Sequence, residues 1–178
     1  MHKRIVCSIA ALASAGLAAS ARADSQANSQ IYGSLGYTQT QLNGAQLGSV
    51  DARVGDKFTP YLGAEGELSV GVNSDAAANL GPEVTQRINT AVAGYGVGFL
   101  PLGNRVSLLA RLGVGETQFG VNNAGAASHL NLASINYGAG AMLNVSPSNS
   151  VRVDYTRKTY DQSGLNANTW GVSLLHHF

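Results

Sequence analysis

The residues of this sequence with the most potential for chemistry are charged side chains spaced two positions apart, such as Asp51 and Arg53, Glu65 and Glu67, and Arg152 and Asp154. The residues between them are apolar, so each charged residue falls on one face of its segment if that segment is a strand. Charges on a buried face have to be paired, which favours a structural network over a catalytic site. The predicted members of this interior charge network are Asp51, Arg53, Glu65, Glu67, Arg105, Arg111, Arg152, Asp154 and Lys158.

A serine, a histidine and a carboxylate also occur in one region. Ser128 and His129 are adjacent, Ser134 follows them, and Glu116 precedes them. These residue types supply the nucleophile, base and acid of hydrolytic triads, but a triad needs its nucleophile and base within hydrogen-bond reach. Neighbours in a loop have no such fixed geometry. We therefore predict no catalytic residue.

Metal and cofactor sites are not expected either. His176 and His177 are adjacent, and a strand directs them to opposite faces, so they cannot share a metal ion. The glycine-rich run 94–98 sits within a strand pattern and opens no helix, whereas a phosphate-binding loop needs one. Cys7 is the only cysteine. We predict no metal and no cofactor.

Eight segments carry the alternation of apolar and polar residues. Each is close to the roughly 9–11 residues that a tilted membrane strand needs. Short proline-bearing turns at 59–60, 101–104 and 146–149 alternate with longer connections, chiefly 73–86 and 120–130. This alternation is typical of an eight-stranded antiparallel up-and-down β-barrel, with short turns at the periplasmic rim and loops at the external rim. The predicted strands cover residues 30–41, 47–58, 61–72, 87–100, 105–119, 131–145, 150–160 and 168–178.

The alternation alone does not say which face is outside, and a soluble barrel with an apolar interior is the alternative. The polar face carries both signs of charge and many glycines, and an eight-stranded bore is just wide enough to be filled by side chains. These features favour a transmembrane barrel with its charges inside. The predicted fourth strand is less regular, because Arg87 and Ile88 break its phase and indicate a bulge. Aromatic residues near strand ends are expected to face the membrane interface: Tyr61, Tyr95, Phe99, Trp170 and Phe178, with Val97 between two of them.

The amino terminus predicts export. Lys3 and Arg4 precede an apolar run over 5–19 and a small-residue cleavage signal ending at Ala23. We predict a cleavable signal peptide at 1–23, with a weaker cleavage signal ending at Ala21, and one barrel domain at 24–178. Charged residues make up 12% of the chain, and no basic excess points to nucleic acid.

Several stretches resemble the small outer-membrane β-barrel family, the outer-membrane-protein-A-like and opacity-protein-like barrels of the porin family. They are 49–55, 58–67, 108–113, 137–141 and 151–155, together with the terminal aromatic Phe178. The resemblance implies location in the outer membrane of a Gram-negative cell. It also implies contact with lipids that include lipopolysaccharide, and assembly by the barrel-assembly machinery and periplasmic chaperones. Trp170 and Phe178 would carry the assembly signal. Asp56, where an aromatic residue is usual, and His176, where tyrosine is usual, depart from the pattern.

The resemblance implies a structural or adhesin-like role without enzymatic activity, in which external loops contact a host or cell-surface ligand. The expected loops are 73–86, 120–130 and 161–166. A narrow solute or ion channel is the first alternative. A lipid-A deacylase that uses Ser128 or Ser134 with His129 and Glu116 is the second.

Overall fold

The computed structural model describes residues 30–76, 84–123, 126–161 and 164–178. The predicted signal peptide and its cleavage site lie outside these residues, as do parts of the predicted external loops. In the described part of the chain, no helix is long and apolar enough to cross a membrane.

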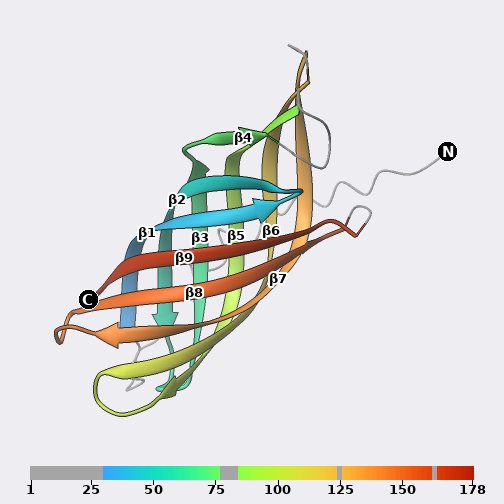
Figure 1. The fold of residues 1–178 in the computed structure, drawn as a ribbon. Coiled ribbons are helices and arrows are strands. Elements are labelled where there is room, and N and C mark those ends of the chain that lie inside the picture. Colours follow the sequence, from blue (N-terminus) through green and yellow to red (C-terminus); the bar gives the residue numbers. More distant parts are fainter. Residues whose placement is uncertain (1–29, 77–83, 124–125, 162–163) are drawn as a thin grey trace.

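The described residues form one antiparallel sheet that closes on itself (Figure 1). Its order is β3-β2-β1-β9-β8-β7-β6-β5, and pairing of β3 with β5 completes the cylinder. The predicted eight-stranded barrel is therefore confirmed, and a short extra strand, β4, pairs with β5 at the external rim. The strands are β1 (Gln30–Leu42), β2 (Ala45–Lys57), β3 (Leu62–Gly71), β4 (Ser74–Ala76), β5 (Val84–Pro101), β6 (Val106–Asn123), β7 (Ala126–Asn144), β8 (Asn149–Tyr160) and β9 (Asn166–His177).

Side chains alternate between the two faces of this sheet as expected. Large apolar residues face outward and are exposed, as for Leu35 at 67%, Leu112 at 64% and Leu174 at 66%. Charged and hydroxyl side chains between them face the bore and are buried. We call the outward apolar side chains the apolar belt, because such a band is what a membrane barrel presents to lipid. The predicted orientation, with charges inside, is confirmed.

The short turns of the periplasmic rim lie where they were expected, but the external rim differs from the prediction. The β1–β2 connection is a two-residue turn, in which Asn43 and Gly44 have φ values of 52° and 83°. Asn-Gly favours this tight hairpin turn because both positions need positive φ. The predicted loop 120–130 was wrong, since β6 continues to Asn123 and β7 begins at Ala126.

Strand β5 contains the predicted bulge, and it reverses the phase that we expected after it. The register of β5 against β6 shifts between Ile88 and Thr90. Tyr95, Val97 and Phe99 consequently face the bore and are buried, so their predicted outward orientation was wrong. The prediction treated aromatic side chains as lipid anchors, whereas pairing of Tyr95 with Glu65 on β3 places its ring within the charged interior.

Candidate functional site

The middle of the bore holds a layer of charged side chains, the charged layer. Arg53 Nε donates to Glu67 Oε2 at 2.9 Å, and Arg53 Nη1 donates to Asp154 Oδ2 at 2.9 Å. Arg111 Nη1 also donates to Glu67 Oε2 at 2.9 Å, and Arg152 pairs with Glu65. Ion pairs connect seven of the predicted residues: Asp51, Arg53, Glu65, Glu67, Arg111, Arg152 and Asp154.

Neutral side chains hold these charges in place. The Arg111 guanidinium lies 4.2 Å from the centroid of the Tyr95 ring, and it donates to the Thr156 hydroxyl at 2.9 and 2.7 Å. The Tyr32 hydroxyl donates to Glu65 at 2.7 Å. Because charges in a low-dielectric interior need every available partner, these contacts fix one arrangement of the layer.

Two predicted members of the network behave differently from the rest. Lys158 is buried on β8, four residues beyond Asp154, and its side chain therefore faces the bore on the same side of the strand as Asp154. Arg105 does not belong to the charged layer, and this part of the prediction was wrong. It is exposed in the periplasmic turn before β6, where its carbonyl accepts the Asn144 N–H. Arg105 lies two residues before the inward-facing Ser107, so the alternation of polar residues continues into the turn that precedes β6. The sequence pattern alone therefore places Arg105 in the bore.

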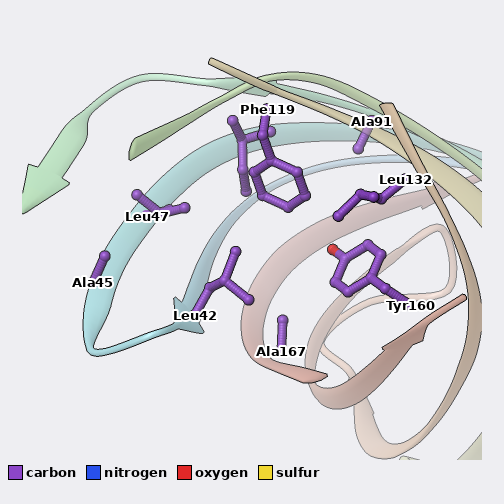
Figure 2. Close-up of a cluster of buried hydrophobic side chains, with 9 residues drawn as sticks. Leu42, Ala45, Leu47, Ala91, Phe119, Leu132, Tyr160 and Ala167 are labelled. Carbon is purple, nitrogen blue, oxygen red and sulfur yellow. The ribbon is translucent and has the colours of Figure 1, made fainter. Parts of the chain in front are cut away.

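Apolar layers close the bore on both sides of the charged layer. The external apolar layer lies toward the external rim, and Figure 2 shows its side chains converging inside the curve of the strands. A periplasmic apolar layer lies toward the opposite rim. The external layer comprises Leu42, Ala45, Leu47, Ile88, Ala91, Phe119, Leu132, Tyr160 and Ala167. The periplasmic layer comprises Tyr32, Tyr95, Val97, Phe99, Leu109, Met142 and Leu175.

Sequence reasoning missed both apolar layers, although the signal was present. Leu42, Leu47, Phe119 and Leu132 occupy the same strand phase as the polar residues of their segments. We interpreted the polar phase as polar along its whole length. Apolar residues in the inward phase near strand ends indicate instead that the ends of the bore are filled.

The structure does not assemble the candidate triad. Ser134 is buried in the bore, where its hydroxyl donates to Asn136 Oδ1 at 2.8 Å, whereas His129 is exposed. Glu116 pairs with Ala133, and His129 pairs with Gly120 four residues further along the ladder. At about 3.3 Å per residue, this spacing separates Glu116 from His129 by roughly 13 Å. Ser128 directly precedes His129 in β7, so the two side chains point to opposite faces of the sheet. Neither serine therefore forms a relay with His129 and Glu116.

The carboxyl-terminal histidines diverge as predicted. His176 is exposed and its Nδ1 lies 3.0 Å from Asn149 Oδ1, whereas His177 faces the bore rim and its Nε2 lies 3.0 Å from Ser150 Oγ. The described residues contain no group of His, Cys, Asp or Glu side chains suited to a metal ion. Asp56 is partly buried beside the periplasmic rim.

Aromatic side chains border the apolar belt. Tyr37, Tyr137 and Trp170 lie at its external border, and the Trp170 ring centroid is 4.8 Å from that of Tyr155. Phe178, which is 80% exposed, lies at the periplasmic border, where its ring packs edge-on against His176 at 4.9 Å. The two residues of the predicted assembly signal, Trp170 and Phe178, therefore both face outward.

Three strands rise beyond this belt on one side of the barrel (Figure 1). They are β5, β6 and β7, and we call their ends beyond Val92, Val114 and Ile135 the external wall. Its outward face is polar: Arg87 Nε donates to Asn89 Oδ1 at 2.7 Å, and Asn89 Nδ2 lies 3.1 Å from His129 Nδ1. The other outward polar residues of the wall are Thr90, Glu116, Gln118 and Asn131.

Side chains cap the external end of β2 where β3 no longer reaches it. Asn73 Oδ1 accepts the Gly48 N–H at 2.5 Å, and its Nδ2 donates to the Gln46 carbonyl at 3.3 Å. Asp75 Oδ2 accepts the Gln46 N–H at 2.8 Å. The pKa of Asp75 is lowered because the Gln46 and Ala76 N–H groups both donate to its carboxylate.

A family model described as the outer membrane protein beta-barrel domain matches residues 8–178. No curated protein sequence is similar enough to count as a match.

Solved structures share the fold at low sequence identity. The N-terminal β-barrel domain of OprF from Pseudomonas aeruginosa has a TM-score of 0.64 at 10% identity, covering 85% of this chain and 100% of that one. The attachment invasion locus protein Ail of Yersinia pestis, in complex with the heparin analogue sucrose octasulfate, gives 0.58 at 17% identity, covering 86% and 100%. Neisserial surface protein A gives 0.57 at 7% identity, covering 84% and 97%.

Proposed function

The chain belongs to the outer membrane protein β-barrel family and is an outer membrane protein, and from this premise we propose that it makes surface contacts through its external wall without catalysing a reaction. The contact would be with a host surface or another cell. We also propose that the apolar belt contacts outer-membrane lipids that include lipopolysaccharide.

The unequal height of the barrel is the observation that carries this proposal. β5, β6 and β7 have 18, 18 and 19 residues, whereas β1 and β2 have 13 each and β8 and β9 have 12 each. Six further residues lengthen a strand by about 20 Å at roughly 3.3 Å per residue. A taller wall is not needed to span the membrane, and its outward side chains are polar. It is suited to contacts above the lipid surface.

The filled bore supports a contact function over conduction. Paired charges occupy the middle, and apolar side chains occupy both ends. A water-filled lumen needs many more strands than eight. We therefore expect no discrete conductance steps when the protein is placed in a planar bilayer, and regular steps would favour a channel instead.

Separated positions of the candidate triad support a non-enzymatic role. The interior hydroxyl of Ser134 and the outward ring of His129 lie on opposite faces of β7. We expect unchanged lipid A after expression, as measured by mass spectrometry. Loss of an acyl chain that depends on His129 would favour a deacylase.

The similarity to Ail is consistent with surface contact, because that protein is described as an attachment invasion locus protein and binds a heparin analogue. At 17% identity, this similarity supports the proposal only through the shared fold.

A shortened wall tests the proposal. Residues 120–129 would be replaced by Asn-Gly, which keeps the pairing of Phe119 with Leu130 and copies the β1–β2 turn. We expect cells that display this variant to attach several-fold less to a reconstituted basement-membrane matrix or to a layer of the same cells. Mobility of unheated against boiled protein controls for folding. Equal attachment at equal surface density would rule out contact through the wall.

We also propose that the barrel-assembly machinery and periplasmic chaperones recognise Trp170 and Phe178. Both side chains are exposed, at 61% and 80%. Phe178→Ala should lower the amount of folded protein in the outer membrane. Phe58→Ala is the matched control, since Phe58 is also an exposed aromatic residue at the periplasmic rim. Equal losses in both variants would argue against a terminal signal.

We also propose that the protein is exported through a cleaved leader. Residues 1–23 would act as the leader, and amino-terminal sequencing of the outer-membrane protein should begin at Asp24. A protein that retains Met1 would contradict this assignment.

A further inference from the structure

Among the residues that the structure describes, one long edge of the sheet has no neighbouring strand beyond the apolar belt. β7 pairs with β8 only from Ser134 to Asn144, because β8 ends at Tyr160. The Asp161 N–H donates to the Ala133 carbonyl at 3.1 Å, and this is the last bond on that side among the residues described. Residues 126–133 of β7 continue upward, paired with β6 alone. Figure 1 shows this hairpin rising past the ends of its neighbours.

The backbone groups that face this edge follow from the ladder. In an antiparallel strand, the N–H and C=O of one residue point to the same side, and the side alternates along the chain. The Ala133 carbonyl points toward β8, so the backbone groups of Asn131 and His129 point the same way. Those of Leu130 and Leu132 bond to β6. With respect to the described part of the chain, the edge therefore presents unused donors and acceptors at strand spacing.

At the external end of β2, by contrast, side chains of this protein cover the backbone groups of an unpaired strand edge. Asn73 and Asp75 occupy the backbone groups of Gln46 and Gly48. Native proteins also protect edges with charged residues and proline, and residues 126–133 contain neither. The β7 edge thus lacks the protection that the β2 edge has.

We propose that this open edge of β7 binds an extended polypeptide segment of a partner protein, which adds to the sheet as a further strand. The inference rests on the proposed surface-contact function and specifies how the contact is made. Alternating N–H and C=O groups at this spacing are complementary to another extended backbone. Lipid headgroups and sugars cannot match that alternation.

The two faces of the wall specify the side chains of the partner. Leu130 is 41% exposed on the bore side above the external apolar layer, while His129 and Asn131 lie on the outward side. A docked strand would place alternate side chains beside Leu130 and beside the polar pair. The partner segment should therefore alternate apolar and polar residues.

Geometry excludes a second copy in the same membrane as the occupant. Two such copies are related by rotation about the membrane normal, and barrel strands tilt by about 35–45° from it. Their β7 strands would therefore cross steeply and could not run antiparallel. A copy on a facing cell could pair, and the experiment below separates this case.

The test uses the isotope-labelled full chain in lipid nanodiscs. The probe is a soluble peptide that alternates valine and threonine over eight residues and carries lysine at each end. We expect saturable binding, with slower hydrogen exchange at the His129 and Asn131 amides and no change at Leu130 and Leu132. Absence of binding, or protection without this alternation, would overturn the proposal. Protection that rises with protein concentration in the absence of peptide would assign the edge to self-association and overturn it too.

Substitutions at one position separate backbone from side-chain effects. Asn131→Pro removes an edge-facing N–H but leaves the β6 ladder intact, and we expect it to weaken peptide binding about tenfold. Asn131→Ala keeps the N–H and should change affinity less than twofold. Equal weakening by both variants would contradict backbone pairing. Heat-dependent mobility on electrophoresis verifies that each variant folds.

Cell attachment distinguishes failure of this inference from failure of the proposed function. If the shortened wall abolishes attachment and Asn131→Pro does not, the contact is made elsewhere on the wall and the edge inference fails alone. If neither variant alters attachment, the proposed function fails as well. Loss in both, with Asn131→Ala retaining attachment, supports both.

Discussion

The barrel within the membrane and the external wall are built from continuous strands but differ in how completely they are paired. Inside the apolar belt, every strand has two neighbours, the inward charges are ion-paired, and the outward side chains are apolar. In the wall, β7 loses one neighbour and the outward face becomes polar. Closure is required where lipid replaces water, because unpaired backbone groups are costly there. Above the membrane, the same strands are free to remain open.

The largest effect should come from breaking the charged layer. Arg111→Ala would leave Glu67 with one ion pair fewer and would vacate the face of Tyr95. Breaking a buried pair costs about 3–5 kcal/mol because it leaves a buried charge uncompensated. We expect the free energy of unfolding, measured with denaturant in lipid vesicles, to fall by that amount.

His129→Ala in the wall is the matched comparison for Arg111→Ala. Its ring is exposed and its contact is with the partly exposed side chain of Asn89. It should change the free energy of unfolding by less than about 0.5 kcal/mol, as surface substitutions usually do. Similar losses in the two variants would remove the distinction between the two regions.

The external apolar layer should come next. Leu132 is 1% exposed, and Leu132→Ala should cost about 3 kcal/mol because it removes buried methyl groups and leaves a cavity. Leu112→Ala, on the lipid face, should cost less because lipid chains can fill the space. Denaturant titration of both variants in the same vesicles measures the difference. A larger loss for Leu112→Ala would mean that the layer is loosely packed.

Glycines on the inward and outward faces of the barrel provide a third comparison. A Cβ at Gly138 would lie 2.1 Å from the Tyr155 carbonyl oxygen and 3.0 Å from Thr156 Oγ1, the hydroxyl that holds Arg111. Gly138→Ala should therefore cost about 1–3 kcal/mol through overpacking. Gly96 faces lipid, and a Cβ there would have only the Leu112 carbonyl oxygen within contact, at 3.9 Å. Gly96→Ala should be neutral in the same unfolding measurement.

Side-chain orientations within the strands could be predicted from the strict alternation of the sequence. The ends of the strands could not, because the alternation does not stop where the strand stops. Outward Val50 and Leu174 and inward Arg53 and Asp154 follow directly from period two, which made the fold and the charged layer predictable. Arg105 shows the limit, because the same parity continues into a turn.

Long-range pairing accounts for the remaining errors. Tyr95 faces the bore because it pairs with the inward-facing Glu65 of β3, and no local pattern fixes that register. The bulge between Ile88 and Thr90 changes the phase of β5 relative to the residues before it. The length of the wall was missed because composition rich in Ala, Asn and Gly over 120–130 indicates a loop. Pairing with the neighbouring strand overrides that weak preference.

The smallest effect should appear at the capped β2 edge, and it depends on pH. The pKa of Asp75 lies below its ordinary value of 3.8 because the ionised carboxylate accepts two backbone N–H groups. A lowered pKa in the folded state means that the cap contributes fully above the ordinary pKa and is lost as pH falls through the folded value. Hydrogen exchange at the Gln46 amide, corrected for its intrinsic rate, should therefore accelerate below about pH 3.8 and stay slow above it.

Asp75→Asn separates the charge of this cap from its shape. The amide oxygen can still accept one N–H, but it cannot titrate in this range. The variant should show faster exchange at Gln46 at neutral pH and no acceleration on acidification, while the open edge at His129 exchanges rapidly in both proteins. If Gln46 exchanges as fast as His129 in the unmodified chain, the two edges are equally open. The contrast between a covered β2 edge and an available β7 edge would then not hold.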